Sequence, residues 1–349
     1  MAGTDPIDAD VARELVSDLV DIPSPSGEER MCAERLQAFF ETHTSDREVW
    51  IDEVGNVRAP ADDVVLYTSH IDTVPGDIPV RIEDETLWGR GSVDAKGPLA
   101  AMAVAAARTG VSFAGVVGEE ADSRGARHLI ADRAPPAAVL NGEPSGWDAV
   151  TLGYRGMLAG TYTVTSDAGH SSRPENNAVE DAIDWWHALR ATFATDPDTP
   201  VVEQVTPKAT AIQGGLSDDG LAVEATLEIQ FRIPAGTTIE SVKTTVMDSI
   251  QNGSIDWMTA IPPVMCDHRA PPARALRGAI RRAGGDPRLL RKTGTADMNL
   301  FAEQWDCPMA TYGPGDSDLD HAPDERLSLA EYDRGVTVLT DVARSLRED

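Results

Sequence analysis

The chain has 349 residues, a length that favours two domains over a single core. It carries 58 Asp and Glu against 30 Lys and Arg, for a formal net charge of −28 at pH 7, which argues against nucleic acid as a partner. The acidic residues are spread over the whole length and lysine is scarce, so we interpret the composition as adaptation to high salt, with an ordinary acidic surface as the alternative.

The cysteines and the N-terminal segment bear on the cellular compartment. Cys32, Cys266 and Cys307 are far apart and form no CxxC pair, which argues against a disulfide framework and a thiolate metal site. The first residues lack the basic and apolar regions of a signal peptide. No uninterrupted apolar run reaches the roughly 18 residues of a membrane span. We therefore expect a cytoplasmic protein that does not span a membrane.

The N-terminal part of the chain is expected to contain two helices. Apolar residues recur with a helical period between residues 8 and 20. After a segment rich in Pro and Ser, a second helix is expected to begin at Ser26 or Gly27. Glu28 and Glu29 would then lie in its first turn, where acidic side chains are favoured.

Three apolar runs, at residues 64–67, 112–117 and 137–140, predict buried strands. Each run is followed by a loop with His or carboxylate side chains. Ligands gather at the carboxyl ends of strands in open α/β sheets, so we expect these side chains to lie close together. They are His70 and Asp72 after the first run, Glu119 and Glu120 after the second, and Glu143 after the third.

Another acidic residue, Asp94, follows the Gly-rich turn at residues 89–91 and precedes a buried helix expected over residues 97–107. A neutral imidazole and a carboxylate at the edge of a sheet can bind a divalent metal such as Zn²⁺. His70 and Asp72 are two residues apart, so in extended chain they point the same way. Asp72 can then hold the second ring nitrogen of His70.

The pattern changes after Val150. Alternating apolar residues over 158–166 and 221–233 predict strands, and the periodicity over 179–192 and 238–250 predicts helices. The resulting order of strand, helix, strands, helix and strand is typical of a small α+β domain with one open sheet.

The last part of the sequence returns to the first domain. Its patterns predict a helix over residues 273–283, a helix that opens at Thr293, a strand over residues 308–312 and a closing helix over residues 328–346. His321 lies in the Gly- and Asp-rich loop after that strand.

We therefore expect an α/β chain with two domains. Residues 1–151 and 266–349 would form the first, a mixed sheet flanked by helices, and residues 152–265 would form the inserted α+β domain.

The polar residues at the strand ends suggest a two-metal site. Two His and three acids suffice to hold two metal ions when one carboxylate bridges them. One more carboxylate must move the proton of the attacking water. Glu119 is the candidate, since neighbouring residues at a strand end face different ways and Glu120 can bind metal. The alternative for any one member is a solvated acid or a structural histidine.

Five motifs follow one another along the chain: His70-Ile-Asp72-Thr-Val-Pro, Gly89-Arg-Gly-Ser-Val-Asp94-Ala-Lys-Gly, Gly118-Glu119-Glu120, Gly142-Glu143-Pro-Ser and Asp320-His321-Ala-Pro-Asp-Glu325. In this order they resemble the motif set of the M20 metallopeptidases. The resemblance implies a zinc-peptidase-like catalytic domain and a ferredoxin-like inserted domain that forms the contact of a homodimer.

Within that family, residues 115–125, 142–156 and 292–299 look most like the lysine and ornithine hydrolases of the amino-group carrier pathway. Those enzymes release lysine or ornithine from the γ-carboxyl of a glutamate at the C-terminus of a small carrier protein. The resemblance therefore implies an amide hydrolase in lysine and arginine biosynthesis.

The resemblance also implies roles for individual residues. Asp94 would bridge two Zn²⁺ or Co²⁺ ions. His70 and Glu143 would complete one metal site, and Glu120 and His321 would complete the other.

Three further residues would take part in catalysis. By the same resemblance, Asp72 would orient His70, and Glu119 would be the general base and acid. His170, in the inserted domain, would reach the active site of a neighbouring subunit and stabilise the oxyanion. The alternative for His170 is an ordinary histidine of a surface loop.

Candidate substrate-binding residues complete the set. Arg155 and Arg232 match positions that bind a substrate carboxylate in related members, with a structural ion pair as the alternative for each. Gly294 and Thr295 lie at the predicted start of a helix, where backbone N–H groups favour an anion such as an α-carboxylate.

The carrier of this pathway is itself acidic. Its docking would need a basic patch, or salt that screens the repulsion between the two proteins. Arg173, Arg269, Arg274 and Lys292 are possible members of such a patch. Other activities stay open, since a deacetylase of N-acetylornithine or N-acetyl-lysine, or a dipeptidase, would use the same metal ligands.

Overall fold

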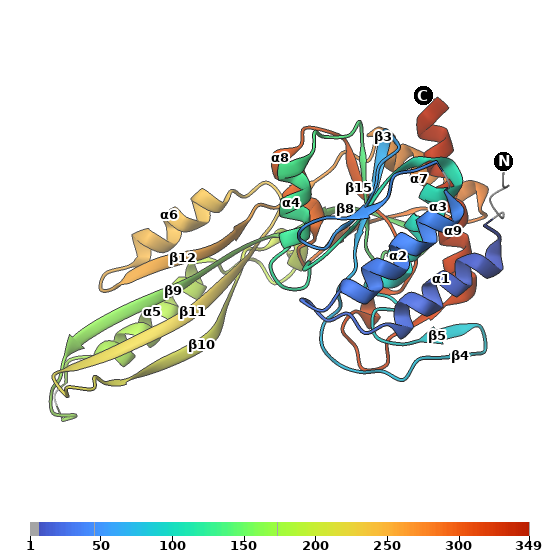
Figure 1. Cartoon of the computed structure of the whole chain (residues 1–349). Coiled ribbons are helices and arrows are strands. Elements are labelled where there is room, and N and C mark those ends of the chain that lie inside the picture. The colour runs from blue at the N-terminus through green and yellow to red at the C-terminus, as the bar shows by residue number, and fades with distance from the viewer. Residues whose placement is uncertain (1–6, 45, 173, 349) are drawn as a thin grey trace. The chain divides into compact units, whose positions relative to one another are not determined.

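The computed structural model describes residues 7–44, 46–172 and 174–348. The chain forms two compact units, whose elements are labelled in Figure 1. Unit 1 comprises Met1–Leu152, Cys266–Leu290 and Ala296–Asp349, and unit 2 comprises Gly153–Met265 and Arg291–Thr295. Each unit buries a hydrophobic cluster of its own.

A mixed sheet forms the centre of unit 1, in the order β1-β2-β6-β3-β7-β15-β8. The four strands β6, β3, β7 and β15 are parallel, while β2 and β8 run antiparallel to their neighbours. The strands are β1 (Trp50–Ile51), β2 (Val57–Ala59), β3 (Asp62–His70), β6 (Val111–Val116), β7 (Val139–Gly142), β8 (Ala149–Tyr154) and β15 (Met309–Thr311).

Helices cover both faces of this sheet (Figure 1). On one face α3 contacts β3 and the helices α1, α2 and α9, and α7 contacts α9; on the other face α4 contacts β6 and α8. The helices are α1 (Ala9–Asp21), α2 (Arg30–His43), α3 (Lys96–Thr109), α4 (Arg124–Asp132), α7 (Pro271–Arg282), α8 (Asp297–Gln304) and α9 (Leu329–Glu348).

The helix α3 is buried on nearly all sides, as its run of small and apolar residues predicts. Only small side chains allow neighbouring helices and the sheet to approach it all round. The helix ends at Gly110, which adopts the left-handed conformation with φ 71°. Burial of this helix fixes the loop at its N-terminus, which carries Asp94.

A smaller sheet lies in the same unit, in the order β16-β5-β4. Its strands are β16 (Arg326–Ser328), β5 (Thr86–Trp88) and β4 (Arg81–Glu83). Arg326 pairs with Trp88, so the end of the His321 loop lies beside the start of the Asp94 loop.

Two predicted helix starts were wrong. The helix α2 begins at Arg30, because residues 25–28 form a turn in which the Glu28 N–H donates to the Pro25 carbonyl at 2.8 Å. The helix α8 begins at Asp297 and not at Thr293. The strand β14 (Arg288–Lys292) was not predicted from the sequence.

Unit 2 contains an antiparallel sheet in the order β10-β11-β9-β12. With the chain order β9, α5, β10, β11, α6, β12, this is the ferredoxin-like arrangement. Its elements are β9 (Gly156–Asp167), α5 (Ala178–Thr192), β10 (Thr206–Leu216), β11 (Ala222–Ile233), α6 (Ile239–Ser249) and β12 (Ser254–Ile261), followed by the short strand β13 (Val264–Met265).

The core of unit 2 lies between this sheet and its helices. Alternate residues of β9 and β11 are buried, as their period-two pattern predicts. Tyr162 of β9 stacks on Trp185 of α5 with ring centroids 3.9 Å apart. The expected α/β fold with a smaller α+β domain is therefore confirmed.

Within the residues that the structure describes, no helix combines the length and the apolar character that crossing a membrane requires.

Candidate active site

The strand order of unit 1 explains how the predicted site residues come together. The strand β3 lies between β6 and β7, and all three are parallel. His70 pairs with Val116, and Ser69 pairs with Gly142. The loops after β6 and β7 therefore begin on either side of His70, and they carry Glu119, Glu120 and Glu143.

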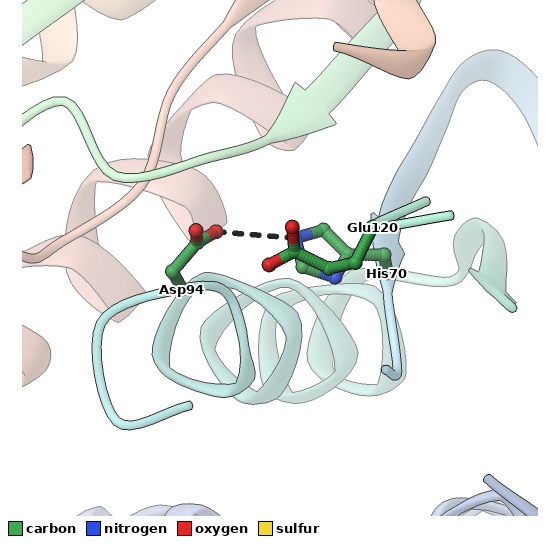
Figure 2. Close-up of side chains that lie close together, drawn as sticks. All are labelled: His70, Asp94 and Glu120. Atoms are coloured by element: carbon green, nitrogen blue, oxygen red, sulfur yellow. Dashed lines mark hydrogen bonds and ion pairs between the residues drawn. The ribbon is translucent and has the colours of Figure 1, made fainter. Parts of the chain in front are cut away.

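The carboxylate of Asp94 lies between two imidazoles. Its Oδ1 is 3.2 Å from Nε2 of His70, and its Oδ2 is 3.1 Å from Nε2 of His321. Figure 2 shows Asp94 directed at the His70 ring, with the Glu120 carboxylate beside that ring. One ligand atom from each of these three residues lies within 4.8 Å of the other two.

Two more carboxylates complete the arrangement, one on each side. Oε2 of Glu143 is 3.8 Å from Nε2 of His70, and Oε1 of Glu120 is 3.1 Å from Nε2 of His321. Each side thus offers one imidazole nitrogen and one carboxylate, and Asp94 offers an oxygen to both. This donor set fits two divalent ions such as Zn²⁺.

The pKa values of both imidazoles, His70 and His321, are raised. Although burial disfavours the charged form, hydrogen bonds with Asp72 and Asp94 raise the pKa of His70 well above its usual range. Hydrogen bonds with Asp94 and Glu120 raise the pKa of the half-exposed His321 to about 10. Without metal, both rings are therefore protonated at neutral pH, and metal binding must release these protons.

The pKa values of Asp94 and Glu143 are shifted in opposite directions. Burial would raise the pKa of Asp94, but its hydrogen bonds with His321 and His70 lower it. Burial raises the pKa of Glu143 well above its usual range, and the nearby charge of Asp94 raises it further.

Asp72 contacts both His70 and the loop after β6. Nδ1 of His70 donates to the backbone carbonyl of Asp72 at 2.9 Å. The Asp72 carboxylate accepts the N–H of Glu119 at 3.0 Å, the N–H of Glu120 at 3.1 Å and the Ser26 hydroxyl at 2.7 Å. Oδ1 of the same carboxylate is 3.7 Å from Nδ1 of His70. The backbone carbonyl and the carboxylate of Asp72 thus both face the imidazole, and the carboxylate also holds the loop.

Glu119 is next to Glu120 in the loop after β6, and its pKa is raised, unlike that of Asp94. Burial raises the pKa of Glu119 well above its usual range; the His70 charge opposes this, and Glu143 and Asp297 add to it. A carboxyl with a raised pKa is suited to accept and return a proton near neutral pH.

Asp297 also belongs to this region, although the sequence patterns assign it no role. It is 2% exposed at the first turn of α8, and its Oδ1 has no hydrogen-bond partner among the described atoms. Burial raises its pKa to about 6, while a hydrogen bond with Ser123 lowers it. The only signal in the sequence was its place in the 292–299 segment, where Gly294 and Thr295 were assigned a role and Asp297 was not.

His170 belongs to unit 2, where its side chain is exposed. Its Nδ1 accepts the backbone N–H of Ser172 at 3.2 Å and lies 2.8 Å from the Ser172 hydroxyl. When Nδ1 is an acceptor, the proton of the neutral ring is on Nε2, which is then a donor.

The four candidate substrate-binding residues also belong to unit 2. The buried Arg155 donates to the Thr293 carbonyl at 2.9 Å and to the Thr206 hydroxyl at 2.7 Å, which ties two segments together. Arg232 reaches the Thr295 hydroxyl at 3.4 Å. Gly294 and Thr295 precede α8, so their N–H groups are not part of its first turn.

A polar pocket of about 220 Å³ lies in unit 2, and its lining includes Arg155, Arg291 and Lys292. Glu203 also lines it and pairs with Arg291 at 2.9 Å. Positive charge is therefore concentrated here in a chain of net charge −28. Of the expected basic patch, Lys292 lies at this pocket, while Arg173 falls outside the described residues.

Known proteins are similar in sequence to this chain over nearly its full length. Residues 66–345 match peptidase family M20/M25/M40. The LysW-lysine hydrolase of Deinococcus radiodurans is 40% identical over 359 residues, which cover 97% of this chain and 98% of the relative. The LysW-lysine/LysW-ornithine hydrolase of Saccharolobus islandicus is 30% identical over 330 residues, which cover 93% of each chain.

The fold is also shared with solved structures. The YXEP protein of Bacillus subtilis, described as a dinuclear metal-binding peptidase, is similar with a TM-score of 0.70 at 14% identity. The match covers 96% of this chain and 97% of that one.

Proposed function

We propose that this chain, which belongs to peptidase family M20/M25/M40, releases lysine or ornithine from a small acidic carrier protein. The reaction is hydrolysis of the amide between the amino acid and the γ-carboxyl of the carrier's C-terminal glutamate. The names of relatives that match nearly the whole chain support this substrate. The observation that carries the metal-dependent chemistry is the Asp94 carboxylate shared between two imidazoles.

Two divalent ions, Zn²⁺ or Co²⁺, are part of the proposal. His70 and Glu143 would hold one ion, His321 and Glu120 the other, and Asp94 both. When bound, such ions polarise a carbonyl and lower the pKa of a water molecule. The convergence of two imidazole nitrogens and three carboxylates supports this assignment.

Glu119 would move the proton in this reaction. Its carboxylate would accept a proton from the attacking water and return it to the nitrogen of the departing amino acid. The raised pKa of Glu119 supports the second step, because it favours the protonated carboxyl, which is the form that acts as an acid. The contacts of the Asp72 carboxylate with the N–H groups of Glu119 and Glu120 would keep this loop in place.

Unit 2 would supply groups that bind the substrate. Nε2 of His170 would donate to the oxyanion in the active site of a second subunit, within a homodimer formed through the inserted domain. Arg232 and Thr295, whose side chains lie within hydrogen-bond distance, would receive the α-carboxylate of the amino acid together with Gly294. Arg155 would support this segment through the Thr293 carbonyl.

The carrier would dock near positive charge. The pocket lined by Arg155, Arg291 and Lys292 supports docking on unit 2, because an acidic carrier is repelled by most of this surface. High salt would weaken that repulsion, in keeping with the proposed adaptation of the chain to high salt.

The proposal also assigns each domain a role. Residues 1–151 and 266–349 would form the catalytic domain, and residues 152–265 the domain of dimerisation. The enzyme would act in the cytoplasm, in lysine and arginine biosynthesis.

A paired assay tests the substrate. One reaction holds carrier protein loaded with lysine or ornithine, the other holds N-acetylornithine, and both contain concentrated KCl and added Zn²⁺ or Co²⁺. Mass spectrometry follows the release of the amino acid or of acetate. We expect release from the carrier. Hydrolysis of N-acetylornithine with the loaded carrier intact would overturn the carrier as substrate and make the enzyme a small-molecule deacetylase.

A further inference from the structure

Glu325 is a fully buried carboxylate four residues after His321. Its Oε1 accepts the backbone N–H of Val93 at 2.8 Å and that of Asp94 at 3.0 Å. Its Oε2 accepts the backbone N–H of Gly91 at 3.1 Å. One side chain thus satisfies three backbone donors of the loop that presents Asp94.

Arg90 completes this cluster from the same loop. Its Nη1 donates to Oε2 of Glu325 at 2.8 Å and to the carbonyl of Ala322 at 3.1 Å. The Gly89 N–H donates back to the carbonyl of Glu325 at 3.4 Å. A buried carboxylate is costly unless it is paired and hydrogen-bonded, and here both of its oxygens are. The loops at residues 89–94 and 321–325 are therefore joined in both directions.

We propose that Glu325 and Arg90 form a clamp that fixes Asp94 and His321 relative to each other and so couples the two metal positions. The clamp touches no substrate, so both are positioning residues. Glu325 acts on Asp94 through the backbone N–H of that residue, and on His321 through the loop they share. This inference rests on the metal site of the proposed function.

The two metal positions depend on the clamp to different degrees. His70 ends β3 and Glu143 follows β7, so both are held by the paired central strands. His321 lies in a loop, half-exposed, and the clamp ties that loop at Ala322 and Glu325. The ion held by His321 and Glu120 should therefore suffer more when the clamp is weakened.

The test is a calorimetric titration of the metal-free protein with Zn²⁺ alone, carried out on the wild type and on Glu325→Gln. Glutamine has the shape of glutamate, but its NH₂ group cannot accept the N–H donors that face one of the two oxygens. We expect the wild type to bind two ions. In Glu325→Gln the weaker ion should bind about 10- to 100-fold less tightly, the range typical for loss of a group that orients metal ligands, while the first ion is retained.

A matched control separates the clamp from the general effect of losing a buried carboxylate. The side chain of Asp52 is 7% exposed, accepts the backbone N–H groups of Val54, Gly55 and Asn56, and pairs with Arg58 at 3.3 Å. None of these partners lies in the loop of Asp94 or of His321. Asp52→Asn should lower stability and leave binding of both ions unchanged.

A second variant keeps the test decisive if Glu325→Gln does not fold. Arg90→Lys keeps the positive charge, but it loses the Nε–H that donates to the Gly76 carbonyl at 3.4 Å and holds the guanidinium in place, and its ammonium is more strongly hydrated, so the bonds to Glu325 and Ala322 should weaken. It should weaken the second ion in the same direction by a smaller factor. The visible absorption of bound Co²⁺, which reports the geometry of its ligands, should change for the second equivalent only.

The outcomes are distinct. Two ions bound with wild-type affinities and spectra in both clamp variants would overturn the clamp and leave the metal site standing. An equal loss in Asp52→Asn would also overturn it, because the effect would then be one of stability. A wild-type protein that binds fewer than two ions would overturn the proposed metal site and the coupling with it.

Discussion

Asp72 shows how one residue can serve two parts of an active site. Its backbone carbonyl accepts Nδ1 of His70, which directs Nε2 at Asp94. Its carboxylate lies 3.7 Å from the same ring nitrogen and also binds the N–H groups of Glu119 and Glu120. The groups proposed to bind metal and the group proposed to move the proton are thus held by the same side chain and its own backbone.

Replacement of Glu119 by Gln should abolish turnover and leave the metal content intact. Glutamine cannot exchange the proton, and loss of a general base and acid typically costs about 10²- to 10⁴-fold in rate. The loop should keep its place, because Asp72 binds the backbone N–H of residue 119 and not its side chain. Assay of turnover together with metal analysis checks this. As a comparison, Glu120→Gln should lose metal as well. Normal turnover of Glu119→Gln would remove Glu119 from the mechanism.

Replacement of Asp297 by Asn should stabilise the metal-free protein above pH 6 and not below pH 4. Burial raises the pKa of Asp297 from 3.8 to about 6, so the folded state disfavours the ionised form. The free energy of unfolding of the wild type is therefore unaffected by this residue below pH 3.8. It decreases as the pH rises from there through about 6, by up to about 3 kcal/mol. The neutral amide avoids this loss and can still accept from Ser123.

Urea unfolding of both proteins between pH 4 and pH 8, with a chelator present, measures this difference. The gap in the free energy of unfolding should open across that range and close when metal is bound. If the Asp297→Asn variant were less stable than the wild type at pH 8, the assigned ionisation would be contradicted.

At the scale of elements, the strand ends could be predicted because apolar runs followed by polar loops mark buried parallel strands. This local pattern was enough to select the side chains after β3, β6 and β7. Their close approach also depends on strand order and register, which join residues far apart in the sequence. That these side chains bind metal stays a prediction.

The start of α8 could not be predicted from local pattern. Residues 293–296 are compatible with a helix, yet Ala296 is extended and its N–H donates to the Asn299 side chain at 3.0 Å. This cap moves the helix start to Asp297 and brings its carboxyl to the buried position described above. Glu325 ends the fifth motif, but its contacts could not be predicted, because its partners lie more than 200 residues earlier in the chain.

Replacement of Gly97 by Ala should destabilise the protein, although Ala favours helices. A Cβ at Gly97 in α3 would lie 2.5 Å from the carbonyl oxygen of Ser92 and 2.9 Å from Leu327. Overpacking of this kind costs about 1–3 kcal/mol. The matched control is Gly278→Ala in α7, where the nearest atom is the flexible end of Arg282 and a gain of about 0.5–1 kcal/mol is expected. Thermal unfolding of both variants checks the difference; a gain in both would mean that α3 shifts at no cost.

At the scale of the whole molecule, charge repulsion and ion pairing oppose each other. The net charge of −28 means that many carboxylates have no cationic partner. The pairs that do form include exposed ones such as Arg282 with Asp341 at 3.2 Å, and pairs of this kind contribute about 0.2–1 kcal/mol each. Salt weakens both effects, so the sign of its action shows which is larger.

The melting temperature should rise with KCl. Screening shortens the range of charge interactions from about 30 Å at 0.01 M to about 3 Å at 1 M, and the 58 acidic residues exceed the 30 Lys and Arg, so repulsion between like charges should be the larger effect. With an unfolding entropy of about 2.1 cal/mol/K per residue, a gain of about 2 kcal/mol would raise the melting temperature of the 349-residue chain by roughly 3 °C. Scanning calorimetry across this range of KCl measures the shift, and sucrose at equal osmolality is the control, because it is excluded from the protein surface without screening charge. A melting temperature that falls with KCl would show that the ion pairs dominate, and would remove the argument for adaptation to high salt.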